Sequence, residues 1–529
     1  MRAPKRALSV FAIGVALALA FFIVPAVTDS GEKASAEWPY TLIYYDGHMH
    51  TTYSDGSGTV ADIKATAQAR GLSVVIVTDH CNMLTLAEWQ SLVADTAAAS
   101  EPGEFLALPG YEITGSEGAF LRDHMNAYNA PDPFVGDDAL ELCPEEAWPD
   151  PPNPAGTGPN VDNLTKWVDY IHSQGGIVNH NHTTGDTRLE YGLNNVEIYN
   201  QGHVDDIMGY ALALGIPPED AWGFAISINN FAIYGETSPA PYSSLNDLVW
   251  FPEIPFQVSL RWALWMATGI LTDVGQVVGW GPFNPANPQS PGDGDLNSWD
   301  ELLMAYVNGE VDHPTFGVAN SDAHNTKWTV DPLESNVGVA KNGLYVLALT
   351  PRQVYKAIEA GRSFATTGPS LAVDVNGMLM GSTAYIPKGG SANLNLSVNS
   401  ESPTAVLAKI DIVKNGDVVD TFNPMSFTFD ETLTYPMDER GYYRVEVTSV
   451  DGVTGAYQFA YSNPVFVKCP FDDDCDGYLN LIEKLLGSDP DDPTSTPEHV
   501  LVPGTCKDTV DNDGDTLIDK ADPGCRWAW

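Results

Sequence analysis

The chain has 529 residues, 43% of them hydrophobic, and this length exceeds what one ordinary core accommodates, so two or three domains are expected. Its 25 basic and 70 acidic residues give a formal net charge of −45, which would repel the phosphate backbone of DNA or RNA over most of the surface. This charge argues against nucleic acid as a partner. It fits a protein that holds calcium or works outside the cell.

Residues 1–36 are predicted to be a secretory signal. Basic residues near the start precede an uncharged apolar run from Ala7 to Val27, and Ala34-Ser35-Ala36 offers a small-residue cleavage site. The apolar run is longer than the roughly 7–15 residues of a usual signal core, so an uncleaved membrane anchor is the alternative. Either way, the protein is expected to be secreted or held at the cell envelope.

The following region reads as alternating strands and helices. Continuous β-branched runs and apolar residues at helical spacing predict strands at 40–45, 72–77, 105–112, 124–128, 177–182, 196–200 and 315–320, and helices at 61–70, 86–99, 163–172 and 299–307. Residues 131–160 read as a long surface excursion, and 202–308 as an elaboration around the site. In barrel-like α/β folds the carboxyl ends of the strands face the mouth of the active site.

Strand after strand in this region ends with a side chain that can bind a metal. His48 and His50 point to one side of their strand, and a turn of Ser, Asp and Gly brings Asp55 back nearby. The later strand ends carry His80, Glu112, His124, His180, His182, Asp322 and His324. Core histidines placed at random would not follow strand ends, so we predict a multinuclear metal centre. Imidazole and carboxylate ligands without thiolates suit zinc, manganese or iron, and Cys81 is interpreted as a small buried residue.

Two further regions follow. From Ala372 to Val467 the chain alternates apolar and polar residues in short runs separated by Asn-Gly and Asp-Gly turns, which predicts a small β-sandwich. In the tail, Cys469 is expected to pair with Cys475 and Cys506 with Cys525, although four cysteines allow three pairings.

The tail also carries two calcium-loop patterns. Asp472 to Glu483 has acids at positions one, three, five and twelve and glycine at position six, and a looser match from Asp511 to Asp522 lacks that glycine. The candidate calcium ligands are Asp472, Asp474, Asp476, Tyr478, Asn480 and Glu483 in the first loop and Asp511, Asp513, Asp515, Asp519 and Asp522 in the second. An acidic solvated tail is the alternative interpretation.

The motifs occur in the order His-x-His, Ser-Asp-Gly, Thr-Asp-His, Gly-Tyr-Glu, a lone His, Asn-His and Ser-Asp-Ala-His. This series resembles the PHP (polymerase and histidinol phosphatase) metalloesterases, and within them the exported CehA/McbA-type branch, which includes carbamate-hydrolysing members. The resemblance covers Tyr40 to Gly368 and implies a distorted (β/α)7 barrel with two or three metals at the carboxyl ends of its strands. A comparable β-sandwich follows the barrel in that branch, and the tail resembles thrombospondin type-3-like calcium repeats.

The resemblance also implies a role for each ligand. His48, His50 and Asp322 would hold one metal, Glu112 would bridge it to a second held by His124 and His182, and Asp55, His80 and His324 would hold a third. This chain has Asn181-His182-Thr183 where the family shows Asn-His-Pro, so His180 could replace or assist His182. Glu112 and His180 are the candidate catalytic residues, His180 as a spare acid for the leaving group.

These interpretations divide the chain into four parts: residues 1–36, a signal or anchor; 40–368, a PHP metallohydrolase barrel with insertions; 369–468, a β-sandwich; and 469–529, disulfide-containing calcium repeats. The predicted function is an exported hydrolase that uses a metal-bridging hydroxide on a phosphoester. Carbamate or carboxylic ester hydrolysis is one alternative, and a non-catalytic calcium-dependent surface protein is another. The expected cofactors are two or three Zn, Mn or Fe ions and tail-bound Ca. The expected partners are a small ester, calcium and the cell surface.

Overall fold

The computed structural model describes residues 38–114, 124–134, 161–181, 192–200, 299–325, 336–453, 456–490 and 492–499, and short runs from 502 to 525. The predicted signal or anchor, most of the predicted excursion at 131–160 and residues 201–298 lie outside these ranges. Within them, no helix is long and apolar enough to cross a membrane.

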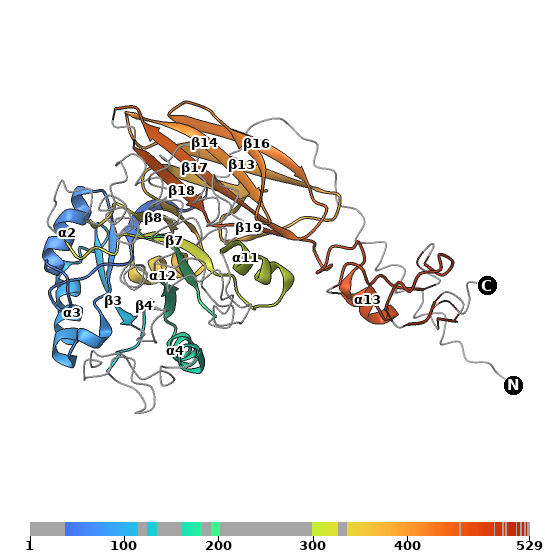
Figure 1. The fold of residues 1–529 in the computed structure, drawn as a ribbon, viewed down its shortest axis with the longest axis horizontal. Coiled ribbons are helices and arrows are strands. Elements are labelled where there is room, and N and C mark those ends of the chain that lie inside the picture. Colours follow the sequence, from blue (N-terminus) through green and yellow to red (C-terminus); the bar gives the residue numbers. More distant parts are fainter. Residues whose placement is uncertain are drawn as a thin grey trace, which may run out of the picture. The chain divides into compact units, whose positions relative to one another are not determined.

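Seven strands of the N-terminal part pair in the order in which they occur in the chain (Figure 1). They are β1 (Thr41–Asp46), β2 (Val74–Val77), β3 (Leu106–Thr114), β4 (His124–Tyr128), β5 (Ile177–His180), β6 (Asn195–Asn200) and β7 (Phe316–Asn320). Strands β1 to β3 are parallel and so are β5 to β7, whereas β4 is antiparallel to both of its neighbours. The amino end of β4 therefore lies at the same edge as the carboxyl ends of the other six strands.

The first and last of these strands approach each other just past their ends. Met49 and Ala323 form an isolated parallel bridge, and the amide of His50 donates to the Ala323 carbonyl at 2.9 Å. The second ladder of β1 is formed with β8 (Lys341–Val346), which runs antiparallel to it. The α/β fold with a mixed sheet agrees with the prediction, and closure into a (β/α)7 barrel stays a prediction.

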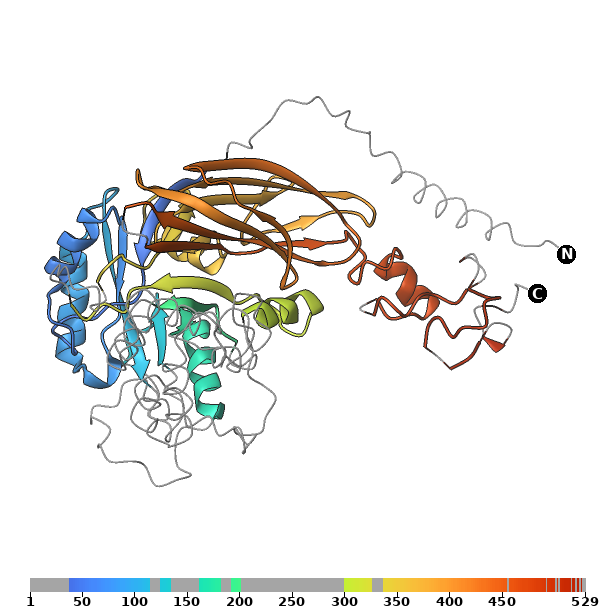
Figure 2. The same ribbon diagram turned by 45° about the horizontal axis from the view of Figure 1, so that its top comes forward.

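Helices α2 (Val60–Ala69) and α3 (Leu86–Ala99) begin at reciprocal caps. The Thr59 and Thr85 hydroxyls accept from the amides three residues on, and the carboxylates there accept from the cap backbones in return. The buried faces of both helices belong to the same apolar core as β2 and β3, beside which they lie (Figures 1 and 2). The other helical segments among the described residues of this part are η1 (Cys81–Met83), α4 (Val161–Ser173), α11 (Trp299–Asn308) and α12 (Pro351–Glu359).

The strands predicted between Ala372 and Val467 form two layers. One is a four-stranded sheet of β10 (Ser370–Val375), β11 (Met378–Leu379), β13 (Ser391–Asn399) and β16 (Thr428–Pro436). The other contains β12 (Thr383–Tyr385), β14 (Ala405–Lys414), β15 (Asp417–Phe422), β17 (Gly441–Asp451), β18 (Tyr457–Ser462) and β19 (Val465–Lys468). Because β18 pairs with β9 (Ser363–Thr366), this second layer continues into the sheet of the N-terminal part (Figure 2).

A buried ion pair joins α11 to β17. Arg444 is fully buried and donates to Asp300 twice, from Nε to Oδ1 at 2.8 Å and from Nη2 to Oδ2 at 2.7 Å. The Tyr442 hydroxyl donates to the same Oδ1 at 2.6 Å, and the guanidinium carbon lies 5.0 Å from the Trp299 ring centroid. One carboxylate from the N-terminal part thus compensates a cation in the middle of a sandwich strand.

The tail contains α13 (Asn480–Leu486) and the two predicted disulfides, Cys469–Cys475 and Cys506–Cys525. Both pairings are therefore confirmed. Cys81 is buried, as expected, and it is also disulfide-bonded, which the sequence interpretation did not include.

Candidate metal centre

Eight of the nine predicted metal ligands lie at the common edge of the strands. His48 and His50 follow β1, Asp55 lies in the turn after them, and His80 follows β2. Glu112 is part of β3, and Asp322 and His324 follow β7. His124 opens β4, and the reversed direction of that strand brings it to the same edge. His182, the ninth predicted ligand, lies outside the described residues.

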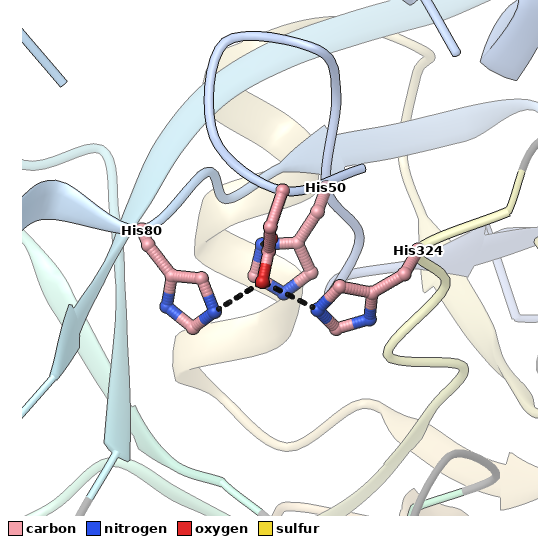
Figure 3. Close-up of side chains that lie close together, drawn as sticks. His50, His80 and His324 are labelled. Atoms are coloured by element: carbon pink, nitrogen blue, oxygen red, sulfur yellow. Dashed lines mark ion pairs between the residues drawn. The ribbon is translucent and has the colours of Figure 1, made fainter. Parts of the chain in front are cut away.

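The eight side chains form three overlapping groups, in each of which the ligand atoms lie within 4.8 Å of one another. The groups are His48, His50 and Asp322; His80, Glu112 and His124; and His50, Asp55, His80 and His324. The first agrees with the expected set, and the third adds His50 to it. In the second, His80 lies with Glu112 and His124. Figure 3 shows His50, His80 and His324 gathered around one point, with ion pairs from Asp55 to His80 at 3.5 Å and to His324 at 3.4 Å.

Glu112 is placed between these groups. Its Oε2 lies 3.4 Å from His48 Nε2, 3.3 Å from His50 Nε2 and 3.0 Å from His80 Nδ1. Its Oε1 lies 2.9 Å from His124 Nδ1 and accepts a hydrogen bond from Asn181 Nδ2 at 2.8 Å. The side chain is almost fully buried, so bulk water does not screen these contacts. This is the arrangement expected of a carboxylate that bridges two ions.

The chemistry of His48 tests whether these residues fit a cation. Its Nδ1 lies 2.9 Å from Oε1 of the buried Glu197, and a carboxylate can only accept, so the proton of neutral His48 is on Nδ1. The Nε2 lone pair then faces Asp322 Oδ1 at 3.2 Å and Glu112 Oε2 at 3.4 Å. Three electron-rich atoms at these distances repel one another unless a proton or a metal ion lies between them. The donor set therefore fits a divalent cation.

The electrostatics of the metal-free site lead to the same conclusion. Burial opposes the charged forms, yet the imidazoles of His80, His48 and His124 hold the pKa of the Glu112 carboxyl well below its usual range. Against the same burial, Glu112 and Asp55 raise the pKa of His80 to about 10, and Asp55 and Asp322 raise that of His324 to about 9. Protons thus occupy the imidazoles of His80 and His324 near neutral pH when no metal is bound, and a metal ion must displace them.

A second buried carboxylate holds the loop that carries Asp55. Asp79 accepts from the amide and the hydroxyl of Thr51, both at 2.7 Å, and from the Ser54 hydroxyl at 2.6 Å. The Gly56 amide closes the turn by donating to the Thr51 carbonyl at 2.9 Å. The position of Asp55 therefore depends on a tight local turn.

Replacing Gly56 with alanine should disturb this turn. A Cβ atom at residue 56 would lie 2.3 Å from the His50 carbonyl oxygen and 2.7 Å from the Thr51 nitrogen, and backbone atoms cannot move aside cheaply. We expect Gly56→Ala to lower the free energy of unfolding by about 1–3 kcal/mol and to reduce the metal content of the protein. Elemental analysis and thermal denaturation would measure both. Gly452→Ala is the control, because its nearest atom would lie at 3.3 Å. Full metal content with unchanged stability would contradict the expectation.

Other predicted and unpredicted residues also lie near the centre. His180 is buried at the end of β5 and does not belong to any potential metal-binding group among the described residues, so its proposed role as an acid stays a prediction. Asn179 and Asn181, on either side of it, donate to Glu197 and Glu112. Glu197 was not among the predicted site residues, although a charged residue within the apolar strand of Val196 and Ile198 is a signal that could have identified it.

Comparison with known proteins gives a match to one family model. Residues 46–132 match the model of the PHP domain, and this range includes six of the eight described ligands. The matched range ends before Asp322 and His324. No curated protein matches the chain.

Three solved structures share similarity with the chain. A two-domain protein containing a predicted PHP-like metal-dependent phosphoesterase from Bacteroides vulgatus ATCC 8482 is 11% identical, with 81% of this chain and 95% of that chain covered and a TM-score of 0.31. A candidate metal-dependent phosphoesterase from Bifidobacterium adolescentis ATCC 15703 is 18% identical, over 35% and 82% of the two chains, with a TM-score of 0.21. An amidohydrolase from Chromobacterium violaceum, solved with bound sulfate and without metal, is 16% identical, over 32% and 81%, with a TM-score of 0.22.

Because these TM-scores are all low, only the PHP-domain match and the site itself bear on the function of this chain. The match covers the first six ligands, and the strand order brings Asp322 and His324 to them. The PHP-domain match and the three groups of metal-binding side chains support a metal-dependent hydrolase.

Proposed function

We propose that this chain is an exported metal-dependent phosphoesterase. The observation that carries the proposal is the position of Glu112, whose two oxygens contact four imidazoles from three potential metal-binding groups. A bridging carboxylate of this kind is what a hydrolytic centre with several metal ions requires. The PHP-domain match over residues 46–132 supports the same chemistry.

The candidate ligands can be assigned to separate metal ions. His48, His50 and Asp322 would hold one ion, and Glu112 would connect it to a second held by His124, with Asp55, His80 and His324 around a third. Divalent ions at this site would supply an activated water molecule near neutral pH and would neutralise charge on the substrate oxygens. Glu112 keeps the ligands at fixed separation, and Asn181 holds the orientation of its carboxylate. His182 stays an expected ligand for the second ion.

The charge balance of the site bears on the substrate. Four carboxylates, of Asp55, Glu112, Glu197 and Asp322, contact the histidines. Two divalent ions would leave the site neutral, and three would leave it with a surplus of two positive charges. A singly charged phosphodiester suits the three-metal form. A neutral carbamate or carboxylic ester suits the two-metal form and is the second candidate.

Metal content and substrate preference test the proposal together. The full-length protein would be examined by elemental analysis and assayed with bis-p-nitrophenyl phosphate, p-nitrophenyl phosphate and 1-naphthyl carbamate. Two or three transition-metal ions per chain with turnover of a phosphoester would support the proposal. Turnover of the carbamate alone would favour the second candidate. Calcium as the only bound metal, without turnover of any ester, would favour the interpretation as a non-catalytic calcium-dependent surface protein.

We also propose a calcium site in the loop from Asp472 to Glu483. Carboxylate oxygens of Asp472, Asp474 and Asp476 lie within 4.8 Å of one another, and Gly477, at position six, has a φ of 103°. Four buried oxygens accept no hydrogen bond from the described residues: Asp472 Oδ1, Asp474 Oδ2, Asp476 Oδ2 and Glu483 Oε2. Buried carboxylate oxygens without donors fit a hard cation such as calcium. Tyr478, through its backbone carbonyl, and Asn480 stay expected ligands.

We propose a second cation site in the tail, with ligands that differ in part from the predicted set. Asp511 and Asp513 lie with Glu498, which is fully buried and was not predicted, in one group that could hold a cation. Asp515 and Asp519 lie outside the described residues. Asp522 is buried and accepts from the Cys525 amide at 3.2 Å. Glu498 precedes the predicted loop by more than ten residues, so loop spacing alone could not identify it.

The pH dependence of the first loop gives a direct test. Burial, with the neighbouring carboxylates, raises the pKa of Glu483 to about 7 and that of Asp474 to about 6 in the calcium-free protein. Both lie above the values of an unfolded chain, about 4, so the calcium-free loop loses stability as pH rises from about 4 to 7. Calcium needs the ionised forms. We therefore expect calcium affinity at least about tenfold weaker at pH 5.5 than at pH 7.5.

Isothermal titration calorimetry and limited proteolysis of the tail would measure these effects. Calcium should protect the tail at pH 7.5, and a chelator should expose it there more than at pH 5. Glu483→Gln should remove the protection. Glu431→Gln, at an exposed glutamate of β16 outside the tail, is the matched control. Equal calcium affinity at both pH values would contradict the assignment.

Export is proposed from the disulfides and the N-terminal segment. The bridges Cys469–Cys475 and Cys506–Cys525, with the disulfide-bonded Cys81, suit an oxidising compartment. Cleavage after residue 36 or anchoring through the apolar run would be decided by N-terminal sequencing of the mature protein.

A further inference from the structure

A buried carboxylate lies behind the metal centre, on β6. Glu197 is fully buried, and its Oε1 is 2.9 Å from Nδ1 of His48. It does not belong to any potential metal-binding group among the described residues. It contacts the His48 ring on the side that faces away from the other candidate ligands.

Amide side chains from neighbouring strands hold this carboxylate in place. Asn320 Nδ2 donates to Glu197 Oε1 at 2.9 Å, and Asn179 Nδ2 lies 3.4 Å from the same oxygen. Asn320 is fixed in turn, because its Oδ1 accepts from the Gly47 amide at 2.9 Å and from Asn342 Nδ2 at 3.2 Å. The orientation of Glu197 is therefore set by the strands and does not depend on a bound ion.

The ladder between β6 and β7 is irregular at this residue. Glu197 pairs with Val318, but the next pair joins Tyr199 to Ala319, so one residue of β6 is left over. Such bulges bend a strand and redirect its side chains, and they are frequent next to active sites. The irregularity adjoins the residue whose side chain contacts His48.

We propose that Glu197 is a positioning residue of the metal centre. It fixes the tautomer and the ring orientation of His48, so that Nε2 carries the lone pair and faces the space between Asp322 and Glu112. This inference rests on the metal-dependent function proposed above. Loss of an outer carboxylate of this kind typically weakens metal binding by about 10–100-fold.

Glu197→Gln is the variant that tests the role. Glutamine keeps the size of the side chain, and its oxygen can still accept from Asn320. It removes the negative charge that fixes the proton on Nδ1 and raises the basicity of Nε2 as a metal ligand. Zinc affinity of the metal-stripped full-length protein would be measured by competition with a chromophoric chelator, in the absence of substrate. We expect Glu197→Gln to bind the tightest zinc ion about 10–100-fold more weakly than the wild type.

Asp374→Asn is the matched control. Asp374 is a buried carboxylate of the sandwich that accepts from the Gly377 amide at 2.7 Å and from Asn395 Nδ2 at 2.9 Å. Because it is distant in the chain from every ligand, its loss should change zinc affinity by less than about twofold. Unchanged affinity in Glu197→Gln, or an equal loss in both variants, would overturn the proposal. A wild-type protein that binds no zinc or other transition metal would instead reject the proposed function itself.

A second measurement uses the wild-type protein and so does not depend on the folding of the variant. Histidine ¹⁵N spectra of the zinc-loaded protein would be compared with those of His48→Asn to assign the His48 signals. A protonated Nδ1 and a metal-bound Nε2 are expected. A His48 ring protonated on Nε2 would overturn the proposal whatever the affinity of the variant.

Discussion

Replacing Glu112 with glutamine is expected to lower kcat/KM on the best ester substrate by a factor on the order of 10³ or more, with loss of at least one metal ion per chain. The carboxylate contacts His48, His50 and His80 through one oxygen and His124 through the other. An amide offers one neutral oxygen in place of two charged ones, so it cannot join two ions. Steady-state kinetics and elemental analysis would measure both changes.

Glu104→Gln is the control for this variant. Glu104 is exposed and lies just before β3, the strand that carries Glu112, so it reports the effect of losing one negative charge nearby in the chain. It should keep full metal content and activity. Wild-type turnover in Glu112→Gln would show that the reaction does not use this centre. Loss of activity with full metal content would assign Glu112 to the chemistry and not to metal binding.

Most of the candidate ligands could be located in the sequence because a local rule places them. His80 follows the continuous β-branched run of β2, and Glu112 lies near the end of the next apolar run. The carboxyl ends of parallel strands lie at one edge of a sheet. Locating the strand ends was therefore enough to predict that these side chains lie close together. The two disulfides and the cluster of Asp472, Asp474 and Asp476 could also be predicted, since each is defined by residues close together in the chain.

What could not be predicted depends on pairing between distant segments. No local pattern reveals that β4 runs antiparallel, and this direction is what brings His124 to the other ligands from the amino end of its strand. The roles proposed for Glu197 and Glu498 depend on such pairing as well. Each is a single acidic residue that contacts side chains distant in the sequence. Glu197 contacts His48, and Glu498 lies with Asp511 and Asp513.

The second large effect is expected in the folding of the chain. Asp300→Ala removes both contacts of the Asp300 carboxylate to the fully buried guanidinium of Arg444, and Glu446 stays as an ion-pair partner. Breaking a buried pair from one side usually destabilises a protein by about 3–5 kcal/mol, because a charge that has lost compensation stays in a medium of low dielectric constant. We expect a loss near the lower end of this range because Glu446 stays. Tyr442 would lose its acceptor as well. Denaturant unfolding followed by tryptophan fluorescence, with Trp299 next to the pair, would measure the change.

The triple variant Asp300→Leu with Arg444→Met and Glu446→Leu separates the charge from the packing. If the loss in Asp300→Ala comes from the poorly compensated cation, removing all three charges should recover most of the stability, since hydrophobic replacements of buried ion pairs are often neutral or stabilising. If the three changes are instead additive, the ion pairs contribute mainly through their shape against Trp299 and Tyr442. Because Asp300 belongs to α11 and Arg444 to β17, recovery would also show that electrostatic compensation, and not a specific polar contact, holds this helix to the sandwich strand.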